Sequence, residues 1–74
     1  MLILIELFGQ LAIGRSRRHT LEWVMGMTAQ EAALKLSLDP EQVGLITING
    51  VQSELPDLLP PGCRLCFFPY VSGG

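Results

Sequence analysis

Residues that commonly carry catalysis are scarce in this sequence of 74 residues, which has one histidine, one lysine and two cysteines. A single histidine cannot form a catalytic triad with acidic residues that lie in separate segments. No serine follows the pattern of a nucleophile elbow, and no G-x-x-x-x-G-K-[ST] loop is present to hold ATP phosphates. We therefore expect neither an independent enzyme nor a cofactor bound by this chain.

The two cysteines form a C-x-x-C motif, Cys63 and Cys66, for which a redox or zinc site is the first hypothesis. Zinc needs about four ligands, and His19 is the one further candidate. Redox motifs of this kind lie at a helix N-terminus, whereas this pair falls in a predicted strand, where residues three apart point to opposite faces. The context favours structural thiols and no metal site.

Strong charge and long apolar runs are also missing. The net charge is −2, so no general affinity for nucleic acid is expected. The apolar start of the chain is too short for a signal peptide, and no stretch is long enough to span a membrane. We expect a cytoplasmic protein without a membrane partner. Three arginines cluster at Arg15, Arg17 and Arg18, where they form either a solvated loop tip or a contact for an anion or acidic partner.

The periodicity of the apolar residues predicts five strands and one helix. Thr28 and Glu31 have the spacing of a capping box, and Asn49-Gly50 is a strong hairpin signal. Glu31 and Lys35 have the spacing of a helical ion pair. The strands are expected at residues 2–8, 19–25, 43–48, 51–53 and 63–68, with the helix from 28 to about 37. This order predicts an α+β fold in which a mixed sheet of four or five strands packs on one main helix.

One helix can cover one face of such a sheet. By strand parity, the other face has polar members at Glu6, Thr47 and Arg64. Its apolar members are Leu2, Leu4, Phe8, Leu45, Cys66 and Phe68. We expect a partner to cover this apolar face. The alternatives are that the loop at residues 55–59 folds over it, or that the parity slips by one residue.

The end of the chain is its most distinctive stretch. After Phe67 and Phe68, Pro69 stops the last strand, and Tyr70, Val71 and Ser72 lead to Gly73 and Gly74. Glycine permits close approach by another molecule, although chain ends are also commonly frayed. We expect a domain at residues 1–69 followed by a flexible tail at residues 70–74.

Several segments together resemble the MoaD/ThiS family of ubiquitin-like sulfur carriers. These are Phe8-Gly9-Gln10-Leu11, residues 43–50 with the Asn-Gly turn, Leu59-Pro60-Pro61-Gly62, and the tail from Phe67 to Gly74. The resemblance covers essentially the whole chain, and the tail is most similar to that of the small subunit of molybdopterin synthase. It implies the β-grasp fold.

The resemblance also implies a mechanism and partners. An E1-like adenylyltransferase would use ATP to adenylate Gly74, and a sulfurtransferase or cysteine desulfurase would supply the sulfur of a thiocarboxylate. The tail would then enter the large subunit of molybdopterin synthase to build the dithiolene of the molybdenum or tungsten cofactor. Phe68 and the apolar face would dock, with charge contacts from Arg64 and the arginine loop. Alternatives are thiamine synthesis, tRNA thiolation, protein conjugation, or an interaction module whose tail has no chemistry.

Overall fold

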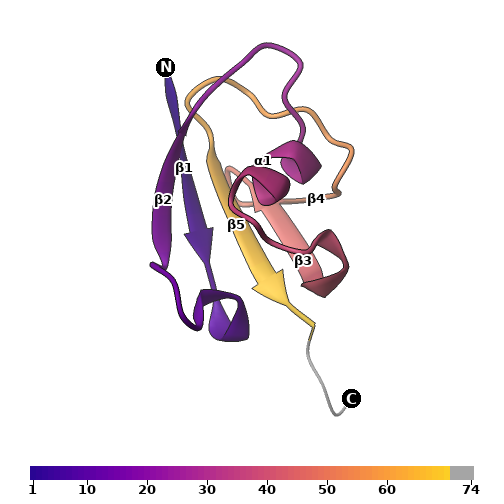
Figure 1. Cartoon of the computed structure of the whole chain (residues 1–74). Helices are drawn as coiled ribbons and strands as arrows, with labels where there is room; N and C mark the ends of the chain where they lie inside the picture. The colour runs from indigo at the N-terminus through magenta and orange to yellow at the C-terminus, as the bar shows by residue number, and fades with distance from the viewer. Residues whose placement is uncertain (71–74) are drawn as a thin grey trace.

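The computed structural model describes residues 1–70 and contains one five-stranded sheet, one α-helix and two short 3₁₀ helices (Figure 1). The strands are β1 (Leu2–Leu7), β2 (Arg18–Glu22), β3 (Val43–Ile48), β4 (Val51–Ser53) and β5 (Arg64–Pro69). The helices are η1 (Gly9–Ala12), α1 (Ala29–Lys35) and η2 (Pro40–Gln42). In residues 1–70 no helix is long and apolar enough to cross a membrane.

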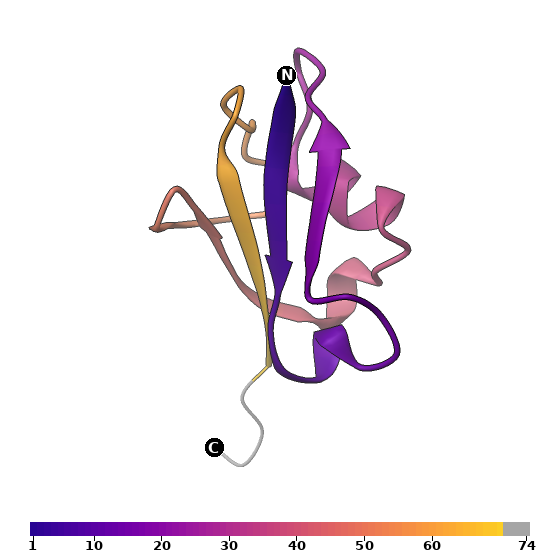
Figure 2. The ribbon, with the colours of Figure 1, turned by 90° about the vertical axis from the view of Figure 1, so that its left-hand side faces the viewer.

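The sheet has the order β2-β1-β5-β3-β4. β1 and β5 are parallel at its centre, and the pairs β1–β2, β3–β5 and β3–β4 are antiparallel. Figure 2 shows α1 on one side of the sheet, so one sheet face is covered and the other is open. The predicted α+β class and the mixed sheet on one helix are confirmed.

The core lies between the sheet and α1. Its centre is formed by inward-facing residues of the two central strands and by small residues of the helix, all no more than 1% exposed: Ile3, Ile5, Leu7, Leu65, Phe67, Ala29, Ala32 and Ala33. Alanine side chains allow a helix to approach a sheet closely. The alternation along β1 and β5 therefore has the predicted phase, and no register slip has occurred.

The helix begins at the predicted capping box. The Glu31 amide donates to Thr28 Oγ1, and the Thr28 amide donates to Glu31 Oε1, both at 3.2 Å. The predicted ion pair between Glu31 and Lys35 was wrong, because that carboxylate is held at the cap and forms no ion pair within residues 1–70.

The helix ends at Lys35, slightly before the predicted end near Ser37. Ser37 adopts a positive φ of 61°, and the Leu38 amide donates back to the Ala33 carbonyl at 2.9 Å. The Ser37 amide also donates to the Leu34 carbonyl, which completes a Schellman motif. Leu38 is buried beyond it, so the helix is stopped by its own C-terminal motif before Asp39-Pro40 is reached.

The hairpin between β3 and β4 has the predicted strands, and its turn residues Asn49 and Gly50 have φ of 52° and 82°. The second predicted strand was too long. β2 ends at Glu22, and Met25 is 84% exposed. The Trp23 amide still donates to the Met1 carbonyl at 2.7 Å, and its indole N–H donates to the Leu59 carbonyl at 2.8 Å, which holds the side chain over the helix side.

The loop at residues 55–59 packs beside the helix. The Leu59 amide donates to the Met27 carbonyl at 2.8 Å, and the Ala29 amide donates to the Asp57 carbonyl at 3.1 Å. Leu59 is buried in the core. The alternative in which this loop covers the other sheet face is therefore wrong, and that face stays open within the described part of the chain.

Two adjacent residues of β1 test the face assignment. Ile5→Ala should lower the free energy of unfolding by about 2–5 kcal/mol, because the side chain is fully buried in the core. Leu4→Ala should change it by less than about 1 kcal/mol, because Leu4 is 56% exposed. Urea unfolding of both variants measures the difference, and equal losses would contradict the assignment.

Candidate functional site

The open face of the sheet carries the residues that the sequence analysis assigned to it. Directly opposed residues of paired strands share a face, and the pairs are Leu4 with Arg64, Glu6 with Cys66, Thr47 with Cys66, and Leu45 with Phe68. Leu2 and Leu4 are more than half exposed, and Leu45 is 38% exposed. We call this set, together with Phe8, the open face.

Two aromatic rings form the end of the open face nearest to the tail. Phe8 and Phe68 stack with centroids 4.5 Å apart and an interplanar angle of 9°. The guanidinium of Arg17 lies 5.9 Å from the Phe8 ring centroid, within the range of a cation–π interaction. Both rings are half-buried, so the pair is packed against its neighbours and still presents apolar surface.

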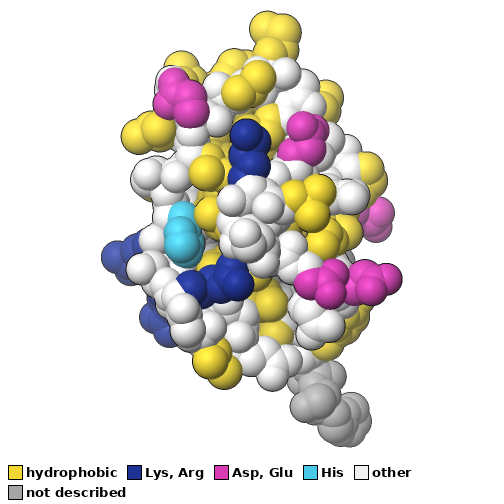
Figure 3. All heavy atoms as spheres, in the orientation of Figure 1, with side chains coloured by type: hydrophobic (Ala, Val, Ile, Leu, Met, Phe, Trp, Pro, Cys, Tyr) yellow, Lys and Arg dark blue, Asp and Glu magenta, His cyan; other side chains and the backbone are white. Residues whose placement is uncertain are grey.

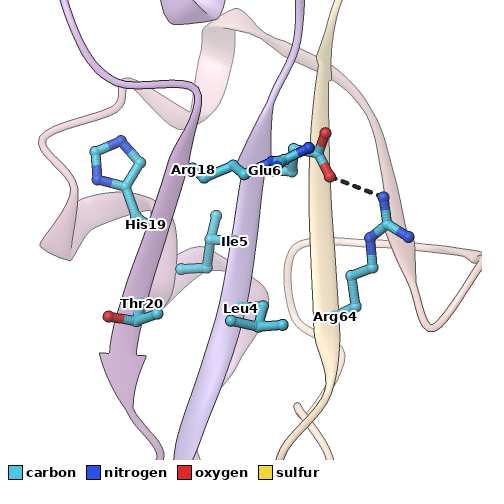
Figure 4. Close-up of a pocket in the computed structure, with 7 residues that line it drawn as sticks. All are labelled: Leu4, Ile5, Glu6, Arg18, His19, Thr20 and Arg64. Carbon is cyan, nitrogen blue, oxygen red and sulfur yellow. Dashed lines mark hydrogen bonds and ion pairs between the residues drawn. The ribbon is translucent and has the colours of Figure 1, made fainter.

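The middle of the open face is polar, because Glu6 lies between Leu4 and Phe8 along the chain. The Arg64 guanidinium donates to Glu6 Oε1 at 2.8 Å, and this hydrogen bond raises the pKa of Arg64 above its ordinary value. Figure 4 shows that the Arg18 side chain crosses β1 toward Glu6. The side chains border an open hollow of about 590 Å³, lined by Leu4, Ile5, Glu6, Arg18, His19, Thr20 and Arg64.

Cys66 needs a correction, because its side chain contributes little surface. It lies on the open face as predicted, but it is only 7% exposed between Glu6 and Thr47. Its thiol therefore lies beneath the neighbouring side chains of the open face and offers a partner little contact area. The sequence indicated this low exposure in part, because a small residue in the central strand of a sheet has side chains of neighbouring strands on both sides.

The C-x-x-C motif does not form a joint site. Cys63 and Cys66 are both free and buried, and Cys63 belongs to the core cluster while Cys66 belongs to the open face. Burial raises the pKa of the Cys63 thiol, which opposes thiolate chemistry. Residues 1–70 also contain no group of three or more side chains that could hold a metal ion. The observed positions agree with structural thiols.

The arginine loop has contacts that the sequence did not reveal. The Arg15 guanidinium donates to the Leu36 carbonyl at 2.7 Å and so ties the loop to the end of α1. A ring nitrogen of His19 lies 2.7 Å from the Ser16 carbonyl oxygen. Figure 3 shows several basic side chains near the histidine on the β2 side of the molecule, and a further basic side chain higher up, near the middle of the view. The loop is therefore partly structural at Arg15, while Arg17 and Arg18 stay exposed.

The chain leaves the sheet between two glycines. Pro69 pairs with Val43 at the end of β5, and Tyr70 is 61% exposed. A Cβ on Gly9 would lie 2.9 Å from Pro69 Cγ, and a Cβ on Gly44 would lie 2.7 Å from Tyr70 Cα. The remaining predicted tail residues, Val71, Ser72, Gly73 and Gly74, lie outside the described residues.

Comparison with solved structures supports the expected fold family. The chain superposes on SAMP1 from Haloferax volcanii with a TM-score of 0.79, 25% identity and full coverage of both chains. A second structure of this small archaeal modifier protein 1 gives 0.78 and 22% identity, covering 95% of this chain and 98% of the other. A protein assigned as molybdopterin converting factor, subunit 1, from Pyrococcus furiosus gives 0.74 and 15% identity over 96% and 99% of the two chains.

The sequence matches no family model and no curated protein. The comparison with known proteins therefore rests on the similarity of the fold. The chain has the ubiquitin-like β-grasp fold, and its structural neighbours are a small archaeal modifier protein and a molybdopterin converting factor subunit. This finding supports the resemblance to the MoaD/ThiS family at the level of the fold.

The buried thiol gives a pH prediction. Because burial raises the pKa of Cys63, the folded protein keeps a proton that the unfolded chain loses near pH 8.5. The contribution of Cys63 to stability should be constant below that pH and should be lost as the pH rises from there through the folded pKa. Thermal unfolding from pH 7 to 10 measures this effect, and Cys63→Ala should remove part of the decline. An identical decline in that variant would show that another group is responsible.

Proposed function

We propose that this chain is a ubiquitin-like sulfur carrier whose Gly74 carboxylate is adenylated and then converted to a thiocarboxylate for the dithiolene of molybdopterin. The observation that carries the proposal is the position of the open face. Its aromatic end contains Phe68, which stacks on Phe8 and directly precedes Pro69, from which the chain continues toward Gly73 and Gly74. A residue of the docking surface is therefore close in sequence to the reactive end.

The chemistry explains why the chain needs an activating partner. A carboxylate is anionic and has no good leaving group, so sulfur cannot displace its oxygen directly. Attack of the Gly74 carboxylate on the α-phosphorus of ATP gives an acyl adenylate and releases pyrophosphate. The terminal sulfur of a persulfide then displaces AMP and forms an acyl disulfide. A second thiol attacks the donor's own sulfur in this acyl disulfide, which breaks the S–S bond, releases the thiocarboxylate and leaves a disulfide on the donor.

The architecture suits delivery to a buried site. Five residues beyond Pro69 reach about 16–18 Å when extended. Gly73 and Gly74 lack side chains, so the reactive carboxylate could enter a narrow channel while the domain stays outside. Ordering the tail costs entropy, and the apolar contact of Phe68, Leu4, Phe8 and Leu45 would offset that cost. Arg64, Pro69 and Tyr70 would contact the partner at the rim.

The proposal implies three partners. An E1-like adenylyltransferase would use ATP to adenylate Gly74, and a sulfurtransferase or cysteine desulfurase would supply the persulfide. The large subunit of molybdopterin synthase would accept the sulfur. The subunit 1 neighbour from Pyrococcus furiosus supports a two-subunit synthase. All of this chemistry would take place in the cytoplasm.

A second function is favoured by a specific observation. Two of the three structural neighbours are described as small archaeal modifier protein 1, and they have higher TM-scores than the converting-factor subunit. The second candidate is therefore a protein modifier, in which a lysine amine of a target attacks activated Gly74. Both candidates share the adenylate, and they differ in the nucleophile that consumes it.

Mass analysis tests the shared chemistry and separates the two outcomes. Protein produced with its activating and sulfur-donating partners should show the replacement of one oxygen by sulfur at Gly74. A variant extended by one residue past Gly74 is the matched control and should keep its original mass. An unmodified wild-type carboxylate under these conditions, or activity of the extended variant, would refute the sulfur-carrier proposal. Amide-linked target peptides without the sulfur exchange would favour the modifier.

A charge on the open face should weaken docking. Phe68→Glu would place a carboxylate in an apolar contact, and we expect at least a tenfold weaker Kd for the large synthase subunit, since buried aromatic anchors often contribute about 2 kcal/mol or more. Titration calorimetry measures the change.

Leu34→Glu is the control for the docking experiment. Leu34 is 55% exposed and lies on the helix, away from the open face. The same charge change there should leave Kd within about twofold of the wild type. If Leu34→Glu weakens binding and Phe68→Glu does not, the partner binds the helix side and the docking assignment is wrong.

A further inference from the structure

Gly44 occupies an unusual position in β3. Val43 pairs with Pro69 and Leu45 pairs with Phe68, so Gly44 is the extra residue of a β-bulge beside the end of β5. A Cβ at this position would lie 2.7 Å from Tyr70 Cα, 2.8 Å from Tyr70 N and 2.9 Å from the Pro69 carbonyl oxygen. All three are backbone atoms, which cannot rotate away as a flexible side chain could.

Glycine is needed at position 44 because of the limited space, and not because of the backbone conformation. The φ of Gly44 is outside the left-handed region, so its backbone suits any L-amino acid. The bulge itself also has a core role, because it turns Val43 inward and buries it. Burial of Val43 does not require the adjacent residue to lack a side chain. The absence of a Cβ at Gly44 instead leaves room for the backbone of Pro69 and Tyr70.

A second glycine borders the same path from the opposite side. Gly9 opens η1 with a φ of 56°, and its Cβ would lie 2.9 Å from Pro69 Cγ. Figure 2 shows η1 at the same end of the sheet as the end of β5. The chain therefore passes between η1 and the β3 bulge, directly after Phe68 on the open face.

We propose that Gly44 is a positioning residue, which fixes the direction in which the chain leaves the sheet at Pro69-Tyr70 and so aims the reactive end once the open face has docked. This inference rests on the proposed function. Docking through Phe8 and Phe68 fixes the domain, and the backbone at residue 70 then sets where the tail begins. A displacement of about 1 Å at a reacting group can cost up to about a hundredfold in rate.

The experiment compares Gly44→Ala with Gly50→Ala in the full chain. Gly50 lies in the distal hairpin turn with a φ of 82° and no atom within 4 Å of an added Cβ, so alanine there strains the fold without touching the exit path. For each variant, the thermal midpoint and the kcat and KM for adenylation by the E1-like partner are measured. Proton NMR follows the contact between the Hα atoms of residues 44 and 70.

The positioning role predicts a specific pattern. Gly44→Ala should lose the contact between residues 44 and 70 and at least about tenfold in kcat, with KM within about threefold because the docking residues are unchanged. Gly50→Ala should lose thermal stability but keep kcat. Equal kcat in Gly44→Ala and wild type, or equal losses in both variants, would overturn the role of Gly44. A wild-type chain that is never adenylated would instead overturn the proposed function.

Discussion

The parallel pairing of β1 with β5 is the contact on which the rest of the structure depends. It joins the first and last strands at the centre of the sheet and brings five almost fully buried side chains together: Ile3, Ile5, Leu7, Leu65 and Phe67. The hairpin partners β2 and β3–β4 extend this pair outward on both sides. Because β5 is central, the chain beyond Pro69 starts from the most constrained part of the domain.

The same arrangement makes the two sheet faces unequal. One helix of seven residues and the loop at residues 55–59 cover one face, and the described part of the chain offers no second layer for the other. Successive residues of β5 therefore lie in different environments, since Phe67 is buried in the core and Phe68 stacks on Phe8 at the open face. One strand thus carries a core residue directly beside a residue of the proposed docking surface.

Much of this fold follows from local sequence signals. Alternation in β1 and β5, the Thr28–Glu31 capping box and the Asn49-Gly50 turn each act within a few residues, and each was predicted correctly. The features that the sequence did not reveal involve contacts between distant segments. A bulge at Gly44 interrupts the alternation of β3 beside β5, the indole of Trp23 bonds Leu59, and Arg15 bonds the end of α1 at Leu36. The closeness of Gly44 to Tyr70 also depends on strand register, which the sequence alone does not state.

We propose that the open face meets the partner while the helix side stays free. This can be tested by following backbone amide resonances of labelled protein as the large synthase subunit is added. We expect signals from Phe8, Leu45, Cys66 and Phe68 to broaden or shift first, and those of Gln30, Leu34 and Lys35 on α1 to stay in place. Changes confined to the helix, with the open face unaffected, would show that the partner binds the opposite side of the molecule.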